Sequence, residues 1–231
     1  MTWPEEFSHG YDEWTAGVTA DINFYVELAG EADGPIVELA VGSGRVAVPI
    51  AVATNRPVIG VDTSPSMLDA ARRRADQAGV ELVLHRCDMA ELQLEEPAAL
   101  IICPFRALLH VPTWAARRRL FERVSASLRP GGRFAWNAFA FDHHFAARVD
   151  GVRVVEGAFA HTDRFAVGDN RVDIVLDTGA TSSLWWATKN EWLGLIDVAG
   201  LEVEALYGDF DRTPVNDHSG EYIFITRRPV T

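Results

Sequence analysis

Apolar positions recur along the first 140 residues in a pattern that predicts strands separated by helices. Five short runs are almost continuously apolar, which is typical of strands that helices cover on both faces. These runs are residues 35–40, 57–62, 81–86, 99–103 and 132–139. Repeated strand–helix–strand units favour right-handed crossovers, so the pattern predicts an α/β fold with a doubly wound parallel sheet.

Helix boundaries between these runs are marked by capping residues. Ser64 and Pro65 open one helical pattern, in the N-cap and first helical positions, and Gly79 ends it. Thr113 opens another helical pattern, which we expect to end at residues 130–132. Both helices therefore fill the connections that a doubly wound sheet requires.

The pattern changes after residue 140. Residues 141–187 indicate short strands, and residues 171–178 alternate in the way of a half-exposed antiparallel strand. A capping box at Thr188 and Glu191 then predicts a helix, and two closing strands are expected at residues 201–208 and 221–228. Because segment 141–187 has too few apolar positions for its own core, we expect one domain over residues 1–231 with 141–187 as a β-rich insertion or lid.

The composition and charge of the chain argue against some classes of binding partner. The formal net charge is −12, and phosphate backbones are bound by basic surfaces, so a nucleic-acid partner is not expected. No apolar run approaches the roughly 18 residues of a membrane span, and the N-terminus lacks the features of a signal peptide. The only cysteines, Cys87 and Cys103, fit a reducing compartment. We expect a cytoplasmic protein with no membrane partner.

A glycine turn raises the question of a cofactor. Gly42 and Gly44 end the first predicted strand and open a helix, where the backbone can approach a ligand closely. Asp62 ends the next strand, in the position of a carboxylate that holds ribose hydroxyls. The turn and Asp62 alone fit either a nicotinamide dinucleotide or S-adenosylmethionine.

Three further residues favour S-adenosylmethionine. Glu38 lies inside the first strand, where a carboxylate could attract the ammonium of the cofactor's amino-acid portion, and dinucleotide sites do not need it. Asp88 ends the third strand, where it could accept a hydrogen bond from the adenine amino group. Met89 follows and could pack on the adenine ring.

Five motifs in this order resemble the class I S-adenosylmethionine-dependent methyltransferases, in particular small bacterial members that act on small molecules. The motifs are VELAVGSGR, VIGVDTSPSML, CDM, ICPFRALLHV and LRPGGRF. The resemblance covers residues 8–140 well and residues 185–228 more loosely. It implies a Rossmann-like sheet of seven mostly parallel strands, with the last strand antiparallel, and S-adenosylmethionine as the cofactor.

The resemblance also implies a set of cofactor-binding residues. Tyr11 resembles an N-terminal tyrosine that closes over the cofactor, and the turn at 40–44 would hold the methionine portion. Ala40 departs from the family, which usually has glycine there, and could narrow the turn. The full expected set is Tyr11, Glu38, Ala40, Gly42, Gly44, Asp62, Thr63, Met67, Asp88, Met89 and Pro104.

The catalytic candidates are histidines placed after the fourth and fifth strands, where a base would meet the acceptor. They are His110, His143 and His144. For His110, capping of the following helix or packing is an equally open role. We expect no metal site, because adjacent histidines point in different directions.

The expected reaction is therefore methyl transfer to a small-molecule metabolite, on the nitrogen of an amine such as an amino sugar or on an oxygen. Two alternatives stay open: a nicotinamide-dependent oxidoreductase and a non-catalytic protein that binds S-adenosylmethionine. A homodimer is also possible, because strands of segment 141–187 offer edges that a second subunit could cover.

Overall fold

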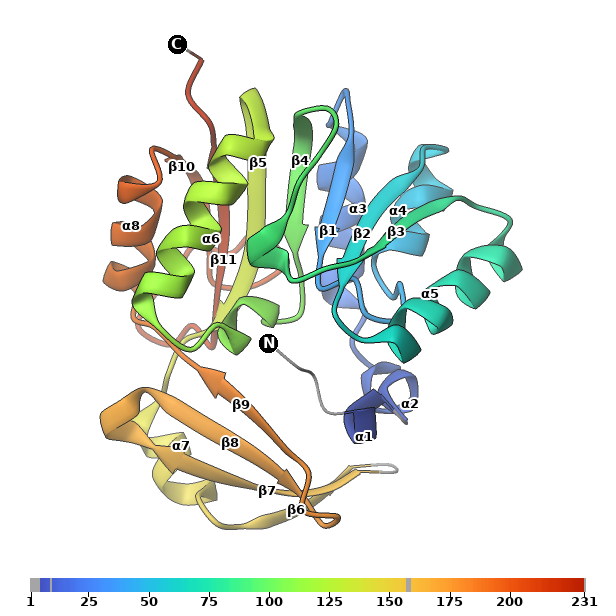
Figure 1. Ribbon diagram of the computed structural model, residues 1–231. Helices are drawn as coiled ribbons and strands as arrows, with labels where there is room; N and C mark the ends of the chain where they lie inside the picture. Colours follow the sequence, from blue (N-terminus) through green and yellow to red (C-terminus); the bar gives the residue numbers. More distant parts are fainter. Residues whose placement is uncertain (1–4, 9, 157–158, 231) are drawn as a thin grey trace.

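A seven-stranded sheet forms the centre of the computed structural model, which describes residues 5–8, 10–156 and 159–230. In spatial order its strands are β10 (Glu202–Tyr207), β11 (Glu221–Arg227), β5 (Leu128–Phe139), β4 (Ala98–Cys103), β1 (Ile36–Leu39), β2 (Val58–Asp62) and β3 (Leu82–Arg86) (Figure 1). Strands β1 to β5 pair in parallel, and β11 runs antiparallel to both β5 and β10. The predicted fold class, with its last strand antiparallel, is confirmed.

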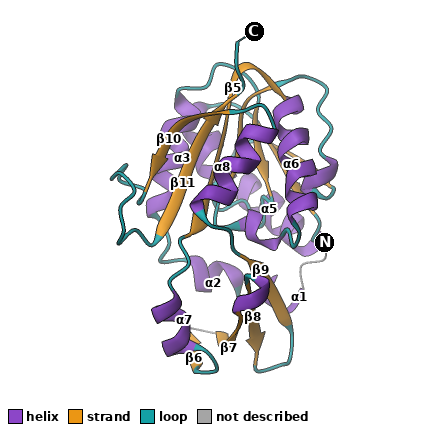
Figure 2. Ribbon diagram, turned by 90° about the vertical axis from the view of Figure 1, so that its left-hand side faces the viewer, coloured by secondary structure: helices purple, strands orange, loops and turns teal. Residues whose placement is uncertain are grey.

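Helices cover both faces of this sheet. One face carries α6 (Trp114–Ser127) and α8 (Lys189–Val198), and the other carries α3 (Ala20–Gly30), α4 (Ala47–Thr54) and α5 (Pro65–Ala78) (Figure 1, Figure 2). In β4, Ile101 and Cys103 pack toward α6, whereas Leu100 and Ile102 pack toward α3 and α4. Because both sides of the strand are buried, it reads as one continuous apolar run.

The capping signals work as the sequence predicts, with one correction. Ser64 Oγ accepts the Met67 N–H at 3.3 Å, Thr113 caps α6, and Thr188 and Glu191 form a reciprocal capping box. The expectation that the second helix extends to residues 130–132 is wrong. The helix ends at Ser127, because Leu128 already pairs with Ala98 at the start of β4.

Several helices lie outside the elements that the sequence pattern predicted. They are α1 (Glu5–Ser8), α2 (Tyr11–Thr15), α3 and α7 (His143–Val149). Helix α3 contributes Phe24, Tyr25 and Leu28 to the core behind the sheet. No helix in the described part of the chain has the length and apolar character to cross a membrane.

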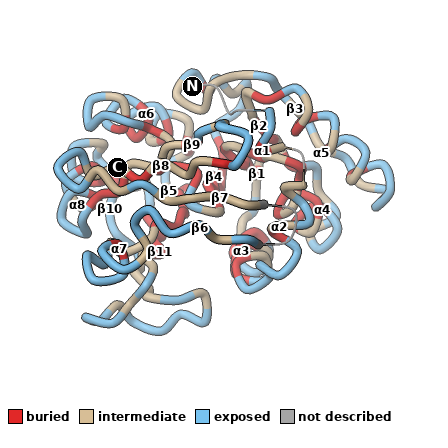
Figure 3. The backbone as a smooth tube through the Cα atoms, turned by 90° about the horizontal axis from the view of Figure 1, so that it is seen from below, coloured by how far each residue is buried: buried red, intermediate tan, exposed pale blue. Residues whose placement is uncertain are grey.

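A second sheet follows α7 and lies beyond the carboxyl ends of the central strands (Figure 1). Its antiparallel strands are, in order, β6 (Arg153–Glu156), β7 (Phe159–Ala166), β8 (Arg171–Leu176) and β9 (Thr181–Trp185). We call these four strands the second sheet. Seen from its side of the molecule, its residues are mostly exposed or half-buried, while β1 and β4 of the central sheet are buried (Figure 3).

Candidate functional site

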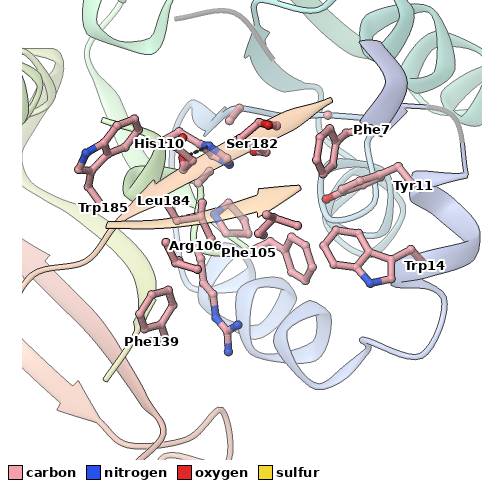
Figure 4. A pocket seen from close by; sticks show the side chains of 18 of the residues that line it. Phe7, Tyr11, Trp14, Phe105, Arg106, His110, Phe139, Ser182, Leu184 and Trp185 are labelled. Atoms are coloured by element: carbon pink, nitrogen blue, oxygen red, sulfur yellow. Dashed lines mark hydrogen bonds between the residues drawn. The ribbon is translucent and has the colours of Figure 1, made fainter. Parts of the chain in front are cut away.

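A cavity of about 750 Å³ separates the carboxyl ends of β1 to β5 from the second sheet. The N-terminal helices α1 and α2 close one end of it with Phe7, Tyr11 and Trp14 (Figure 4). Its volume lies in the range of roughly 300–1,000 Å³ that is common for small-molecule sites. In doubly wound sheets, ligands bind at this edge of the strands.

Most of the residues expected to bind a cofactor line this cavity. Those that do are Tyr11, Ala40, Gly42, Asp62, Thr63, Met67, Asp88, Met89 and Pro104. Glu38 and Gly44 are not among the lining residues. Parallel pairing of β1, β2 and β3 brings these separate motifs to one edge, which is why they meet in space.

Asp62 is held firmly at the end of β2. Its Oδ2 accepts the Gly42 N–H at 2.9 Å, and its Oδ1 accepts the Ser64 N–H at 2.9 Å. Burial raises the pKa of this carboxyl group, and the backbone hydrogen bonds oppose that shift. The oriented carboxylate still has acceptor capacity, so it could receive the hydroxyls of a ribose.

Gly42 and Gly44 have different roles in the glycine turn. Gly42 lies at the cavity with a φ of 54°. Gly44 instead packs behind the turn, where an added Cβ would lie 3.3 Å from the Cβ of Ala71 and from a methyl of Val48. Ala40, where the family usually has glycine, adopts a left-handed φ of 53°, a conformation that costs non-glycine residues roughly 1–2 kcal/mol.

Glu38 is buried beside this turn, with an exposure of 3%. Its Oε2 has no hydrogen-bond partner among the described residues. Burial raises the pKa of Glu38 well above its ordinary value, and Arg45 opposes the shift. A buried carboxylate oxygen of this kind is stabilised by a cationic donor, which fits the ammonium of an amino-acid portion bound at the turn.

Tyr11 forms an aromatic cluster with Trp14 and Phe105 at the end of the cavity that α1 and α2 close (Figure 4). The three rings meet edge to face, with centroids 6.0–6.3 Å apart. Arg45 lies over the Phe105 ring at 4.8 Å and is itself held by both carboxylate oxygens of Asp21. Burial raises the pKa of Tyr11 to about 12, so its hydroxyl is protonated at neutral pH.

The loop after β4 is strained. Phe105 and Arg106 adopt left-handed φ angles of 54° and 63° in succession, and such strain in non-glycine residues concentrates at functional sites. Arg106 Nε donates to Glu221 Oε1 at 2.6 Å, and Asn137 Nδ2 donates to Glu221 Oε2 at 3.4 Å. The guanidinium of Arg106 is therefore already paired with a carboxylate.

The predicted histidines divide into two groups. His110 lines the cavity, and its Nδ1 lies 3.2 Å from the carbonyl oxygen of Ser183 (Figure 4). Burial lowers the pKa of His110 to about 4, so the ring is neutral at physiological pH. His143 and His144 stand at the start of α7 and are not among the lining residues, although the adjacent Asp142 is.

The second sheet supplies cavity residues that sequence reasoning missed. His161, Asp163 and Phe165 alternate along β7, and all three line the cavity. The sequence predicted only a short strand here, with no alternation assigned to it. Which of its faces meets the cavity could not be known, because that depends on how the sheet docks.

Comparison with known proteins agrees with the fold and with these motifs. Residues 36–132 match the family described as a methyltransferase domain. A curated relative, 27-O-demethylrifamycin SV methyltransferase of Amycolatopsis mediterranei, is 28% identical over an alignment of 145 residues that covers 59% of this chain. The chain spans about half the length of that relative, 52%.

Two solved structures share the whole fold. The CcbJ methyltransferase of Streptomyces caelestis superposes with a TM-score of 0.80 at 23% identity, covering 96% of each chain. CalS10, an amino pentose methyltransferase of Micromonospora echinaspora, gives a TM-score of 0.67 at 21% identity, covering 99% of this chain and 98% of its own. At sequence identities of 23% and 21%, these similarities show a shared fold and nothing about the substrate.

The glycine turn and Asp62 left two cofactors open, and the family match now decides between them. A methyltransferase domain covers both motifs, together with Glu38 and Asp88. The resemblance implied a sheet of seven strands with the last strand antiparallel, and the structure has such a sheet, with β11 as its antiparallel last strand. Residues 36–132 are therefore similar to a methyltransferase domain, and the chain has the fold that its resemblance to the class I S-adenosylmethionine-dependent methyltransferases implied.

Proposed function

We propose that this protein transfers the methyl group of S-adenosylmethionine to a small molecule, with an amine nitrogen as the acceptor. One observation carries the proposal. A single cavity is lined on one side by the cofactor motifs of the central sheet and on the other by apolar and acidic side chains of the second sheet. Segment 141–187 would then act as a lid over the acceptor.

Each cofactor residue has a part in this proposal. Asp62 would hold the ribose hydroxyls, Asp88 and Met89 the adenine, and the turn with Glu38 the methionine portion. S-adenosylmethionine, when bound, supplies an electrophilic methyl group on a sulfonium. The remaining work falls to the protein, which must align the acceptor, exclude water and accept a proton.

The charge of the cavity supports an amine. Its described lining holds four carboxylates against one guanidinium, namely Asp62, Asp88, Asp142 and Asp163 against Arg106. Because Arg106 is paired with Glu221, the surplus is negative and attracts a cationic acceptor. CalS10, which shares the fold, is named an amino pentose methyltransferase, and this agrees with an amine.

A hydroxyl acceptor is the second candidate. The name of the curated relative refers to a 27-O-demethyl substrate, and the cavity is large enough for a bulky apolar molecule. Aromatic lining residues such as Phe139 and Phe141 would contact such a substrate in either case.

The test is a methylation screen. The protein is incubated with S-adenosylmethionine and with pairs of acceptors that differ only in carrying an amine or a hydroxyl, including nucleotide-linked amino sugars. S-adenosylhomocysteine and a product heavier by one CH₂ unit should form with the amine member. Tight binding of S-adenosylmethionine without turnover on any acceptor would instead favour a non-catalytic binding protein.

A further inference from the structure

The inner face of the second sheet carries a histidine–aspartate pair. His161 and Asp163 lie two residues apart on β7, so their side chains project from the same face of the strand. His161 Nε2 lies 3.6 Å from Asp163 Oδ1. Both residues line the cavity, and their side chains are largely shielded, with exposures of 12% and 26%.

Strand register places this pair among apolar and hydroxyl side chains. Asp163 is paired with Ile174 of β8, and Ile174 is paired in turn with Ser182 of β9. Ile174 and Ser182 also line the cavity. Within the strand, Phe165 extends the same face. Attraction between a carboxylate and a cation is stronger in such a partly desolvated setting than in water.

Other ionisable groups at this side of the cavity are less suited to receive a proton from an amine. Burial lowers the pKa of His110 to about 4, and its Nδ1 faces the Ser183 carbonyl. Arg106 is a cation already paired with Glu221. Asp142 is engaged as the N-cap of α7, where it accepts the N–H groups of His144 and Phe145.

We propose that Asp163 binds the ammonium group of the acceptor and that His161 removes its proton before methyl transfer. This inference rests on the proposed function and assigns residues to its acceptor side. With Nε2 turned toward Asp163, Nδ1 of His161 is the atom that accepts the proton. The carboxylate of Asp163 lies 3.6 Å from the other ring nitrogen of His161, Nε2.

The step balances as follows. The ammonium of the acceptor gives one proton to His161 and becomes a neutral amine with a free lone pair. The C–N bond forms as this lone pair attacks the methyl carbon, and the C–S bond breaks with its electrons left on the departing thioether. His161 then releases its proton to water, and the methylated ammonium leaves the cavity.

A binding experiment tests Asp163 without knowledge of the natural acceptor. Sinefungin carries an amine where S-adenosylmethionine carries its methyl group, and S-adenosylhomocysteine has neither. Calorimetric titration of both into wild type and Asp163→Asn gives the ratio of their dissociation constants. We expect the preference for sinefungin to fall about tenfold in Asp163→Asn, the loss of one charge-assisted hydrogen bond.

The matched control is Asp177→Asn, which makes the same change at the end of β8. Asp177 is an exposed partner of Arg153 and is not among the lining residues. Its variant should keep the wild-type ratio. An unchanged ratio in Asp163→Asn would overturn the inference, whereas failure of wild type to bind either ligand would overturn the proposed function as well.

Turnover tests His161 with the amine acceptor found in the screen. His161→Ala should lower kcat about 100-fold or more, as loss of a general base does, with the KM for S-adenosylmethionine unchanged. Imidazole added to the buffer should restore part of the lost rate, which a merely structural role would not allow. A screen that yields only hydroxyl acceptors would overturn the amine assignment while leaving methyl transfer intact.

Discussion

The central sheet and the second sheet face each other across one cavity, but the chain holds them very differently. All residues of β4 are buried between two layers of helices. Strands β8 and β9 have mostly half-buried residues, because one side of their sheet is open to solvent. The comparison teaches that one wall of the cavity is part of a sheet covered by helices on both faces, whereas the opposite wall is a single half-exposed sheet.

The two regions are joined at a few contacts. His110 from the central domain meets the Ser183 carbonyl of β9, and Arg117 of α6 donates to the carbonyl of Trp185. Phe141 and Trp186, near the two ends of segment 141–187, stack with ring centroids 4.0 Å apart. His110, Ser183 and Trp185 also line the cavity, so changes at these contacts should affect both sides.

The largest expected effect is a difference in how much stability is lost when an aromatic side chain is removed from the central sheet or from the second sheet. Trp136 is fully buried between Phe134 and Phe224, with centroids 4.7 and 4.9 Å away. Trp136→Ala should lower the free energy of unfolding by about 3–5 kcal/mol. Phe165→Ala, in the half-exposed second sheet, should cost about 1 kcal/mol. Urea unfolding measures both, and equal losses would mean that the two regions are packed alike.

The pH dependence of stability tests the contact between the two regions at His110 and Ser183. His110 has a pKa of about 4 in the folded protein against an ordinary 6.5, so below pH 6.5 the unfolded chain binds a proton that the folded chain does not. The stabilisation is present above pH 6.5 and is lost as pH falls toward 4, by on the order of 3 kcal/mol.

Unfolding by urea at several pH values measures this slope. His110→Gln should flatten it between pH 6.5 and 4, whereas His85→Gln, on an exposed position of β3, should leave it unchanged. A slope that persists in His110→Gln would show that other groups carry the acid sensitivity.

A third prediction compares ligand binding after a substitution on each side of the cavity, at Asp62 and at Asp163. Asp62→Ala should weaken S-adenosylmethionine binding about 100-fold, since it removes a charged hydrogen-bond acceptor and leaves the Gly42 N–H without its partner. Asp163→Asn should leave S-adenosylhomocysteine binding nearly unchanged. Calorimetry gives both values, and a similar loss in the two variants would contradict the division of the cavity into cofactor and acceptor sides.

The smallest expected effect concerns the turn that departs from the family. Ala40→Gly should relieve the left-handed strain at φ 53° and raise the free energy of unfolding by up to about 1 kcal/mol. Asn55→Gly, at φ 51° after α4, is the control, because asparagine tolerates this conformation. Thermal unfolding measures both, and a loss of stability in Ala40→Gly would show that the Ala40 methyl group contributes useful packing.

The sequence by itself determined the central sheet and the residues that its strand ends contribute to the cavity. Continuous apolar runs, caps at Ser64 and Thr113 and the glycine turn are local signals, and parallel pairing then brings the ends of the strands to one edge. Asp62 and Asp88 could be found for that reason. The boundary at residues 130–132 was missed because strand pairing of Leu128 overrides the local turn signal.

Only the tertiary structure decided what the second sheet does. The sequence predicts short strands in segment 141–187, but not that His161 and Asp163 face the cavity while His143 and His144 are not among its lining residues. That outcome depends on how a separate antiparallel sheet docks across the central one, through contacts between residues far apart in the chain. Local patterns carry no information about such docking, because many orientations of a small sheet satisfy the same alternation.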